Sequence, residues 1–496
     1  MLRSYWYIIL FSFLSGNTFS QYHVQYDNQA IEIYTDLIDL KFAEANEKLN
    51  TFKKSSPNNL VYLHLENYYD FFQIFIYEEE AFFEQAKKRK ESRIDLLKEL
   101  QDSDPYKKFV LAEINLQWAL ARSKFDELFK SGREIYKAYT LLEKNVKEFP
   151  NFIYSYKSLS LIHSLIGTVQ VPGLFKSILG FNESLEQGIK EIDAVVKFAQ
   201  ENDFMFQAEA ESIQVFLQLY QVNNKAAAEA ALASSSLQQL DSPLAAFVQV
   251  KLYERLGQND QALELLLTTL SHTSVKEFPY LYFMTGMCHL RKLDGEAESY
   301  FTEFIENFNG VHYLKEAYQK LAWSAIIANN DTVKYFQYLE KCKTEGEALI
   351  DGDKQALKEA EAHIVPNPIL LKARLLYDGG YNQKAYRLLI INSEEFHGSD
   401  EYSLEYYYRL GRVTQALKNY PEAIKHYYRT FTFDPEFKSF MSCNASLQLG
   451  LIYESQNDFI EARSHFDRCL SMHPTQYKNS LHQKAKSGLL RIKNFK

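Results

Sequence analysis

Apolar residues recur three or four positions apart along nearly the whole chain of 496 residues. That spacing places them on one face of an α-helix, whereas a β-strand alternates at every second residue. The segment FVLAEINLQWALARSKF, residues 109–125, shows the helical spacing, and no sustained alternation occurs elsewhere. Glycine and proline, which interrupt helices, number only 18 and 11. The pattern therefore predicts an all-α fold.

Two consecutive segments near the C-terminus carry small, aromatic and proline residues at the same offsets. In each segment a glycine is followed by an alanine, an aromatic residue and a proline, namely Gly411, Ala423, Tyr427 and Pro435, then Gly450, Ala462, Phe466 and Pro474. A glycine and an alanine on facing helices allow a close approach, and a proline ends the second helix. The spacing predicts a repeated pair of helices.

These segments, residues 404–437 and 443–476, resemble the tetratricopeptide repeat, a helix–turn–helix unit of about 34 residues. Earlier segments keep the register, with Val250, Gly286, Ala322 and Ala373 at the glycine position. The resemblance implies an α-solenoid of helical hairpins that coils as a right-handed superhelix. We expect this solenoid to occupy residues 201–496.

Between Ala322 and Ala373 the interval is 51 residues, which exceeds the 36 to 39 found between the other units. We expect the extra residues, 343–368, to extend the second helix of that repeat and to end in a loop at Pro366 and Pro368. In the same repeat, Val333 stands near the alanine position.

The first half of the chain departs further from the pattern. Ala45 and Ala138 each precede a proline by twelve residues, as second helices of the repeat do. Residues 21–200 therefore read as divergent helical hairpins with longer helices.

The first twenty residues predict a secretory signal peptide. Arg3 is followed by a mostly apolar run from Tyr5 to Leu14 and then by small polar residues before Gln21. A membrane anchor is the alternative, but the run is short for a bilayer. With a composition rich in Lys, Asn, Tyr and Phe, the chain is similar to exported proteins of Gram-negative Bacteroidota. That similarity implies the periplasm or the periplasmic face of the outer membrane.

Glycine and proline gather near residues 165–190, in a chain otherwise poor in both. Two interpretations remain open. A short helix at residues 174–179 would fold back into the solenoid core, whereas an apolar hairpin at residues 165–181 would dock on a membrane or a partner.

Charge and motifs exclude several classes of function. The formal net charge is −9, and the two signs are interspersed without a basic stripe, so we expect no nucleic-acid partner. HExxH, GxSxG, GxGxxG and a phosphate-binding loop are missing from the sequence. We therefore expect no enzyme, no cofactor and no metal. His426 and His465 are expected at the surface.

Four cysteines make no disulfide framework, but one pair has a geometric argument. Cys443 and Cys469 stand at the start of the first helix and the end of the second helix of one repeat. An antiparallel hairpin brings these ends together, and a disulfide requires Cα atoms within about 7 Å. Both a disulfide and a pair of buried thiols remain open.

The family resemblance also implies a binding surface, because residues of the first helices line the concave groove of such solenoids. The matching positions are Lys251, Arg255, Phe283, Arg291, Trp323, Arg374, Tyr377, Tyr408 and Arg412. Arginine and aromatic residues suit protein interfaces. We expect a non-enzymatic scaffold or adaptor of the cell envelope that holds a protein or peptide in this groove. The alternative is a membrane-associated protein that docks through residues 165–181.

Overall fold

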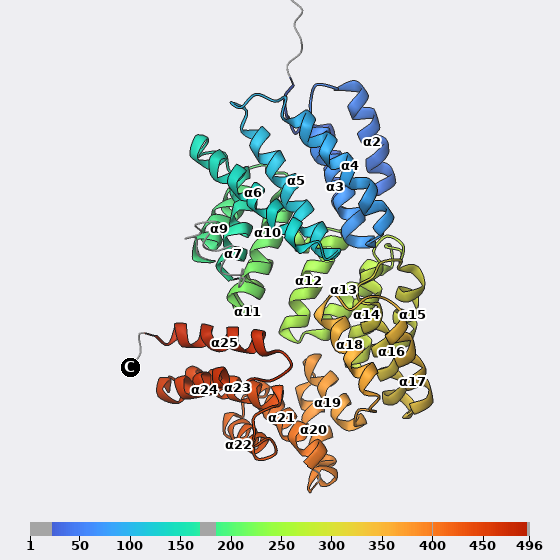
Figure 1. The fold of residues 1–496 in the computed structure, drawn as a ribbon, viewed down its shortest axis with the longest axis vertical. Helices are drawn as coiled ribbons and strands as arrows, with labels where there is room; N and C mark the ends of the chain where they lie inside the picture. Colours follow the sequence, from blue (N-terminus) through green and yellow to red (C-terminus); the bar gives the residue numbers. More distant parts are fainter. Residues whose placement is uncertain (1–21, 169–184, 399, 494–496) are drawn as a thin grey trace, which may run out of the picture. The chain divides into compact units, whose positions relative to one another are not determined.

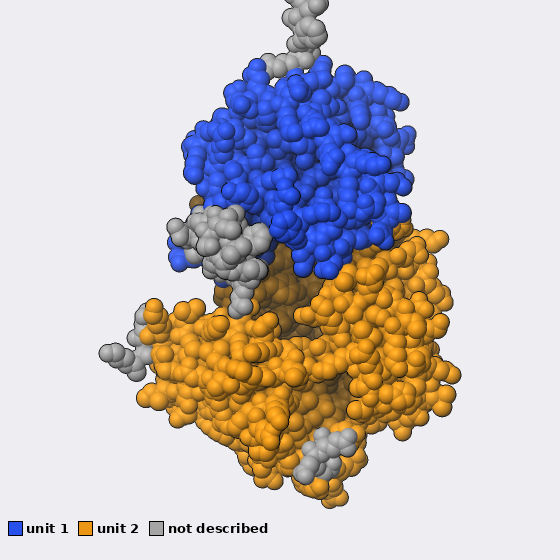
Figure 2. All heavy atoms as spheres, in the orientation of Figure 1, with its two compact units in different colours: residues 1–75, 80–195 blue, residues 76–79, 196–496 orange. Residues whose placement is uncertain are grey.

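The computed structural model describes residues 22–168, 185–398 and 400–493. The predicted signal peptide and most of the Gly/Pro-rich segment, with its two interpretations, lie outside these residues. In the described part the regular elements are helices and no β-strand occurs, which confirms the all-α solenoid (Figure 1). Two compact units can be distinguished, residues 1–75 with 80–195 and residues 76–79 with 196–496 (Figure 2). The sequence-based boundary at residue 200 stays a prediction.

Unit 1 is built from long amphipathic helices. In chain order they are α1 (Asn28–Ile38), α2 (Phe42–Ser55), α3 (Val61–Tyr77), α4 (Glu80–Leu97), α5 (Pro105–Lys124), α6 (Leu128–Glu148), α7 (Tyr154–Thr168) and the start of α9 (Leu185–Glu201). Ala45 on α2 and Ala138 on α6 are fully buried, as the alanine position of a second helix requires. Glu113 and Lys157 are also buried, and their side chains form an ion pair of 2.8 Å.

Unit 2 continues as pairs of shorter helices. They are α10 (Gln207–Phe216), α11 (Lys225–Ala233), α12 (Pro243–Leu256), α13 (Asn259–Leu270), α14 (Pro279–Lys292), α15 (Ala297–Asn307), α16 (Leu314–Asn329), α17 (Thr332–Thr344), α18 (Asp351–Ala362), α19 (Pro368–Asp378), α20 (Asn382–Ile391), α21 (Asp400–Ala416), α22 (Tyr420–Thr432), α23 (Phe440–Ser455), α24 (Phe459–Ser471) and α25 (Lys478–Arg491). The repeats seen in the sequence are the hairpins α12–α13, α14–α15, α16–α17, α19–α20, α21–α22 and α23–α24.

Each hairpin buries the residue that was predicted to stand where its two helices approach each other. All six side chains or glycines at the eighth position of the repeat are buried: Val250, Gly286, Ala322, Ala373, Gly411 and Gly450. A Cβ atom added to Gly411 would lie 2.6 Å from the Tyr427 ring, and one added to Gly450 would lie 2.6 Å from the Phe466 ring. The aromatic ring of the second helix therefore occupies the space that a side chain would need.

Two expectations for the insertion and its repeat are wrong. Residues 343–368 do not extend α17, which ends at Thr344; a loop with Gly346 at φ +68° precedes a separate helix, α18. Val333 is 69% exposed, whereas Tyr335 is fully buried. The turn before α17 places Asn330 in the left-handed region and Asp331 at the N-cap, so the buried face starts two residues later.

The insertion changes how the solenoid coils. α18 packs on α16 and α17, and the next helix, α19, packs on α14 as well as α16. The packing of α19 on α14 brings together the backbones of Gly257 and Gly380, both of which have a positive φ. A Cβ atom added to Gly380 would lie 1.8 Å from the Gly257 carbonyl oxygen. The Tyr381 hydroxyl donates to Asp260 Oδ1 at 2.7 Å and accepts from Asn259 at 3.1 Å.

The last helix, α25, covers the end of the final hairpin. It packs on α23 and α24, and the Phe466 ring lies between Gly450 and Gly488. Of the helices that the structure describes, none is long and apolar enough to cross a bilayer.

Replacing Gly411 with alanine tests the contact between ring and backbone. An alanine in a helix normally stabilises a protein by about 1 kcal/mol relative to glycine. We expect Gly411→Ala to lower the free energy of unfolding by about 1–3 kcal/mol instead, because the added methyl group collides with Tyr427. Urea denaturation followed by circular dichroism measures the change.

Gly352→Ala on α18 is the matched control. Its added Cβ meets the carboxylate of Glu316, the mobile end of a long side chain that can move away. We expect this variant to keep or raise the stability. A Gly411→Ala protein as stable as the control would contradict the packing argument.

Candidate functional site

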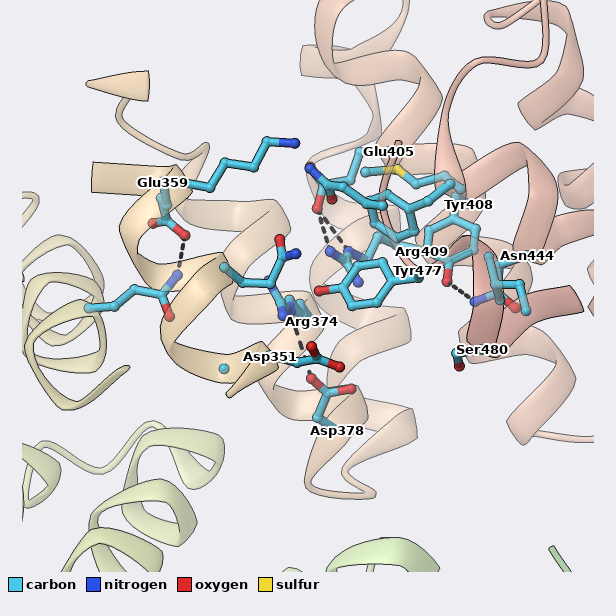
Figure 3. Close-up of a pocket in the computed structure, with 18 of the residues that line it drawn as sticks. Asp351, Glu359, Arg374, Asp378, Glu405, Tyr408, Arg409, Asn444, Tyr477 and Ser480 are labelled. Atoms are coloured by element: carbon cyan, nitrogen blue, oxygen red, sulfur yellow. Dashed lines mark hydrogen bonds and ion pairs between the residues drawn. The ribbon is translucent and has the colours of Figure 1, made fainter. Parts of the chain in front are cut away.

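A cavity of unit 2 with a volume of about 660 Å³ lies among α16, α18, α19, α21, α23 and α25. Figure 3 shows residues from several of these helices pointing into it, with Glu359 on one side and Asn444 and Ser480 on the other. A second cavity of about 300 Å³ is lined by residues of α12, α14, α16 and α19. The two share Glu316, Lys320, Trp323, Arg374 and Asp378, so they form one surface, called the groove below.

The groove is positively charged, although the chain carries a net charge of −9. Nine basic side chains line it: Lys251, Arg255, Arg291, Lys320, Lys358, Arg374, Arg409, Arg412 and Lys484. Six acidic side chains accompany them: Glu254, Glu316, Asp351, Glu359, Asp378 and Glu405. The surplus of cations favours an anionic ligand.

Five of the cations have a carboxylate partner within the groove. Glu254 binds both Arg291, at 2.8 Å, and Lys251, at 2.9 Å. The other pairs are Lys320–Glu316, Arg374–Asp378 and Arg409–Glu405. Burial raises the pKa of Glu254, but Arg291 and Lys251 outweigh it and hold the pKa at about 2. This carboxylate is therefore ionised at neutral pH.

Trp323 joins the two cavities. Two cations lie over its ring, Lys320 with Nζ 3.9 Å from the ring centroid and Arg374 with Cζ 4.9 Å from it. The indole Nε1–H donates to Glu359 Oε1 at 2.6 Å. Because only 3% of Trp323 is exposed, the residue orients charged side chains more than it offers contact area.

Arg412 is held by tyrosines and not by a carboxylate. Its guanidinium donates to the Tyr377 hydroxyl at 2.8 Å and to the Tyr408 hydroxyl at 2.8 Å. The Tyr408 hydroxyl also accepts from Asn444 Nδ2 at 2.6 Å (Figure 3). Gln448 donates to Asn444 Oδ1 at 3.0 Å and thereby orients the amide.

Seven of the nine residues selected from the sequence line the groove: Lys251, Arg255, Arg291, Trp323, Arg374, Tyr408 and Arg412. Tyr377 contacts the groove through Arg412. Phe283 does not belong to it, because its ring packs in the core against Phe301 and Phe304, with only 4% of the residue exposed. The binding role of the eight others stays a prediction.

The sequence analysis missed the contributions of α18 and α25. Lys358 and Glu359 come from α18, and Ser480 and Lys484 come from α25. The spacing of Leu481, Ala485 and Leu489 is a helical signal in the sequence. It did not reveal that this helix turns one polar face toward the groove.

The expectation that His465 lies at the surface is wrong. Only 3% of the residue is exposed, its ring stacks on Tyr453, and Nε2 lies 3.0 Å from the Tyr428 hydroxyl. Burial, with Arg468 nearby, lowers its pKa to about 4. Among the described residues, no group of three or more His, Cys, Asp or Glu side chains is arranged to hold a metal ion.

Cys443 and Cys469 lie side by side at the end of the α23–α24 hairpin. Their sulfur atoms are 3.5 Å apart, without a bond, and both residues are fully buried. Cys288 and Cys342 are also buried free thiols. Burial raises the pKa of Cys288 and of Cys342 to about 12.

Comparison with known proteins supports the type of repeat. A sequence model of the tetratricopeptide repeat matches residues 444–476, which include most of α23 and all of α24. The chain is similar to human IFIT1 in a dimer with PPP-AAAA, at 16% identity over 82% of this chain and 90% of that chain, with a TM-score of 0.37. It is also similar to yeast Tom70, at 12% identity over 94% and 90%, with a TM-score of 0.35. No curated protein matches.

Removing the charge of Glu254 tests the ion pairs of the groove. We expect Glu254→Gln to lower the free energy of unfolding by about 2 kcal/mol at pH 7, because Arg291 and Lys251 lose their partner. A folded-state pKa near 2, below the ordinary 4.5, means that the ionised group stabilises the fold above pH 4.5. The difference between variant and wild type should therefore shrink as the pH falls from 4.5 toward 2.

Glu264→Gln, on an exposed position of α13, is the control and should change the stability by less than about 0.5 kcal/mol. A Glu254→Gln effect that stays constant over this pH range would argue against the lowered pKa.

Oxidation tests the cysteine pair. We expect diamide to link Cys443 to Cys469, because a small side-chain rotation brings their sulfur atoms together. Peptide mapping without reduction identifies the link. Cys288 and Cys342 should remain thiols, and a scrambled mixture of bridges would refute the predicted geometry.

Proposed function

Since the chain is a tetratricopeptide-repeat protein, we propose that it is a non-enzymatic scaffold that binds a protein or peptide partner in the groove. The observation that carries the proposal is the continuity of the two cavities along the first helices of successive hairpins. A continuous groove lined by several successive helices suits an extended segment or a helix of another protein.

The composition of the groove supports this proposal. Arg374 and Arg412 line the groove beside Trp323 and Tyr408, and arginine is among the residues that account for much of the binding energy at protein interfaces. Their hydrogen bonds and ring contacts hold several of them in place before a partner arrives. A preorganised surface loses less conformational entropy on binding.

For its location, we propose the periplasm or the periplasmic face of the outer membrane, in the role of an envelope adaptor. The support is the apolar stretch behind Arg3 in the sequence. The alternative is a membrane-associated protein that docks through residues 165–181. Flotation with liposomes distinguishes the two, because only the alternative expects binding that Phe175→Asp abolishes.

A photo-crosslinking amino acid at Ser480, which is exposed and lines the groove, identifies the partner in envelope extracts. The same amino acid at Lys425, exposed on α22, is the control. We expect one protein to be linked from position 480 and not from position 425. Equal labelling from both positions would contradict a groove-bound partner.

The purified partner then allows a quantitative test. We expect the combined variant Arg374→Ala, Tyr408→Phe and Arg412→Ala to weaken binding at least tenfold, because several anchor contacts are lost. Arg387→Ala with Lys425→Ala removes two exposed charges from the second helices and should bind as wild type. Isothermal titration measures both, and unchanged binding by the first variant would refute the groove assignment.

A further inference from the structure

The outer face of α6, in unit 1, carries a cationic stripe. All lysine and arginine residues of this helix are exposed: Lys130, Arg133, Lys137, Lys144 and Lys147. Of its acidic residues only Glu148 is exposed, whereas Glu134 is buried and Glu143 is partly buried. In the sequence the two signs alternate along this segment, so the stripe becomes visible only in the folded helix.

The exposed positions follow the period of the helix closely. Three or four positions separate each of these exposed residues from the next: Phe129, Arg133, Lys137, Thr140, Lys144 and Lys147. At a rise of about 1.5 Å per residue, the stripe is about 27 Å long. The opposite face of α6, with Ala138 and Leu142, packs on α5 and α7 (Figure 1). The helix therefore presents one continuous surface to solvent.

The acidic side chains nearest the first turns of α6 are engaged inside the fold. Glu134 is buried and forms its ion pairs with residues of α4 and α5. Glu127, just before the helix, is shared by three cations, of which only Lys130 belongs to α6. Arg133 and Lys137 form no ion pair with a carboxylate of the residues that the structure describes. These two cations are therefore available to an external anion.

The ion pairs at the far end of the stripe are loose. Lys144 Nζ lies 3.8 Å from Glu148, and Lys147 Nζ lies 3.4 Å from Glu143. The two lysine side chains are 64% and 75% exposed. Exposed pairs of this kind contribute little to stability and are easily exchanged for other partners.

Large apolar side chains are exposed on the same helix. Leu128 is 62% exposed and Phe129 is 67% exposed, both in its first turn. Tyr136, which is 44% exposed, lies next to Lys137 within the stripe. Because apolar surface is favourably removed from water, an uncovered phenyl ring beside cations indicates a surface that another body covers.

A cationic outer face is not general among the long helices of unit 1. The α4 helix exposes one cation, Lys88, together with four acidic residues: Glu80, Glu84, Glu91 and Asp95. The combination of exposed cations and exposed apolar residues therefore distinguishes α6.

We propose that the outer face of α6 docks on an anionic lipid surface, with Arg133 and Lys137 at the headgroups and Leu128 and Phe129 inserted between them. Helices that lie in the plane of a bilayer interface combine these two kinds of residue. Each lysine or arginine close to an anionic surface adds to the attraction. This surface lies outside the groove and does not depend on the function proposed for it.

The apolar residues favour lipid over nucleic acid. A nucleic-acid backbone is bound through cations, hydroxyls and backbone amides, so Leu128 and Phe129 would stay in water beside it. The headgroup layer of a bilayer accepts both the charges and the apolar side chains of one helix face.

Co-sedimentation with lipid vesicles tests the surface, using the chain without its first twenty residues. We expect binding to vesicles of phosphatidylglycerol and phosphatidylcholine in equal parts, and much weaker binding at high salt or to phosphatidylcholine alone. Arg133→Gln with Lys137→Gln should weaken the binding at least tenfold. The matched control, Lys54→Gln with Lys88→Gln, removes two exposed cations from other helices of unit 1 and should bind as wild type.

Fluorescence tests the insertion of the first turn. The emission of Phe129→Trp should shift to shorter wavelengths when the anionic vesicles are added, because the indole enters the headgroup layer. Ile391→Trp, at a 79% exposed position of α20, is the control and should keep its emission. Phe129→Gln should weaken vesicle binding by a similar factor at low and at high salt, because it removes apolar contact and no charge.

Absent binding to the anionic vesicles, equal weakening in the lysine control or an unshifted emission of Phe129→Trp would overturn the proposal. So would tighter binding of a DNA duplex than of the vesicles, which would assign the stripe to nucleic acid. Loss of vesicle binding in Phe175→Asp would assign the membrane contact to residues 165–181 instead. None of these outcomes changes the crosslinking expected from Ser480, so the scaffold and the lipid surface fail separately.

Discussion

The contact between an aromatic ring and a bare Cα atom sets the geometry on which unit 2 depends. In the hairpins with Gly286, Gly411 and Gly450, a ring of the second helix lies where a side chain of the first would stand. The two helices therefore pack closely, and each hairpin presents its first helix to the inside of the coil. Where the glycine is replaced by Val250, Ala322 or Ala373, the residue is still fully buried. The concave surface follows from this one packing rule, repeated along the chain.

Much of this architecture could be predicted because the rule is local in sequence. The spacing of Gly411, Ala423 and Tyr427 indicates which residues face each other across a hairpin, and all three are buried in the structure. The groove was less accessible to prediction. Phe283 occupies a position that often faces the groove, yet its ring packs in the core against four aromatic neighbours. The α18 helix brings Glu359 into the groove because the chain turns in the loop after α17 that contains Gly346. The sequence shows a helical pattern on both sides of that loop, so it did not reveal the turn.

The charge of the groove could not be predicted from the sequence, because it depends on how the solenoid coils. Arg412 and Lys484 line the same cavity although they are distant in the sequence, and no local pattern marks them as neighbours. Within one hairpin, charges find partners close in sequence, as Arg409 does with Glu405. Between distant hairpins no such pairing is built in. The coil therefore brings cations of distant hairpins onto one surface, some of them without a carboxylate partner among the described residues.

The contact of Gly257 with Gly380 has a consequence for how unit 2 unfolds. A solenoid whose repeats touch only their neighbours loses structure one repeat at a time from its ends. Here α19 packs on α14, and the Asn259 amide reaches the Tyr381 hydroxyl across 122 residues of sequence. The two hairpins between these points, α14–α15 and α16–α17, and the helix α18 are enclosed by these contacts, so we expect fraying to start in the elements outside them. We therefore expect the segment from α12 to α20 to unfold as one cooperative block and not repeat by repeat.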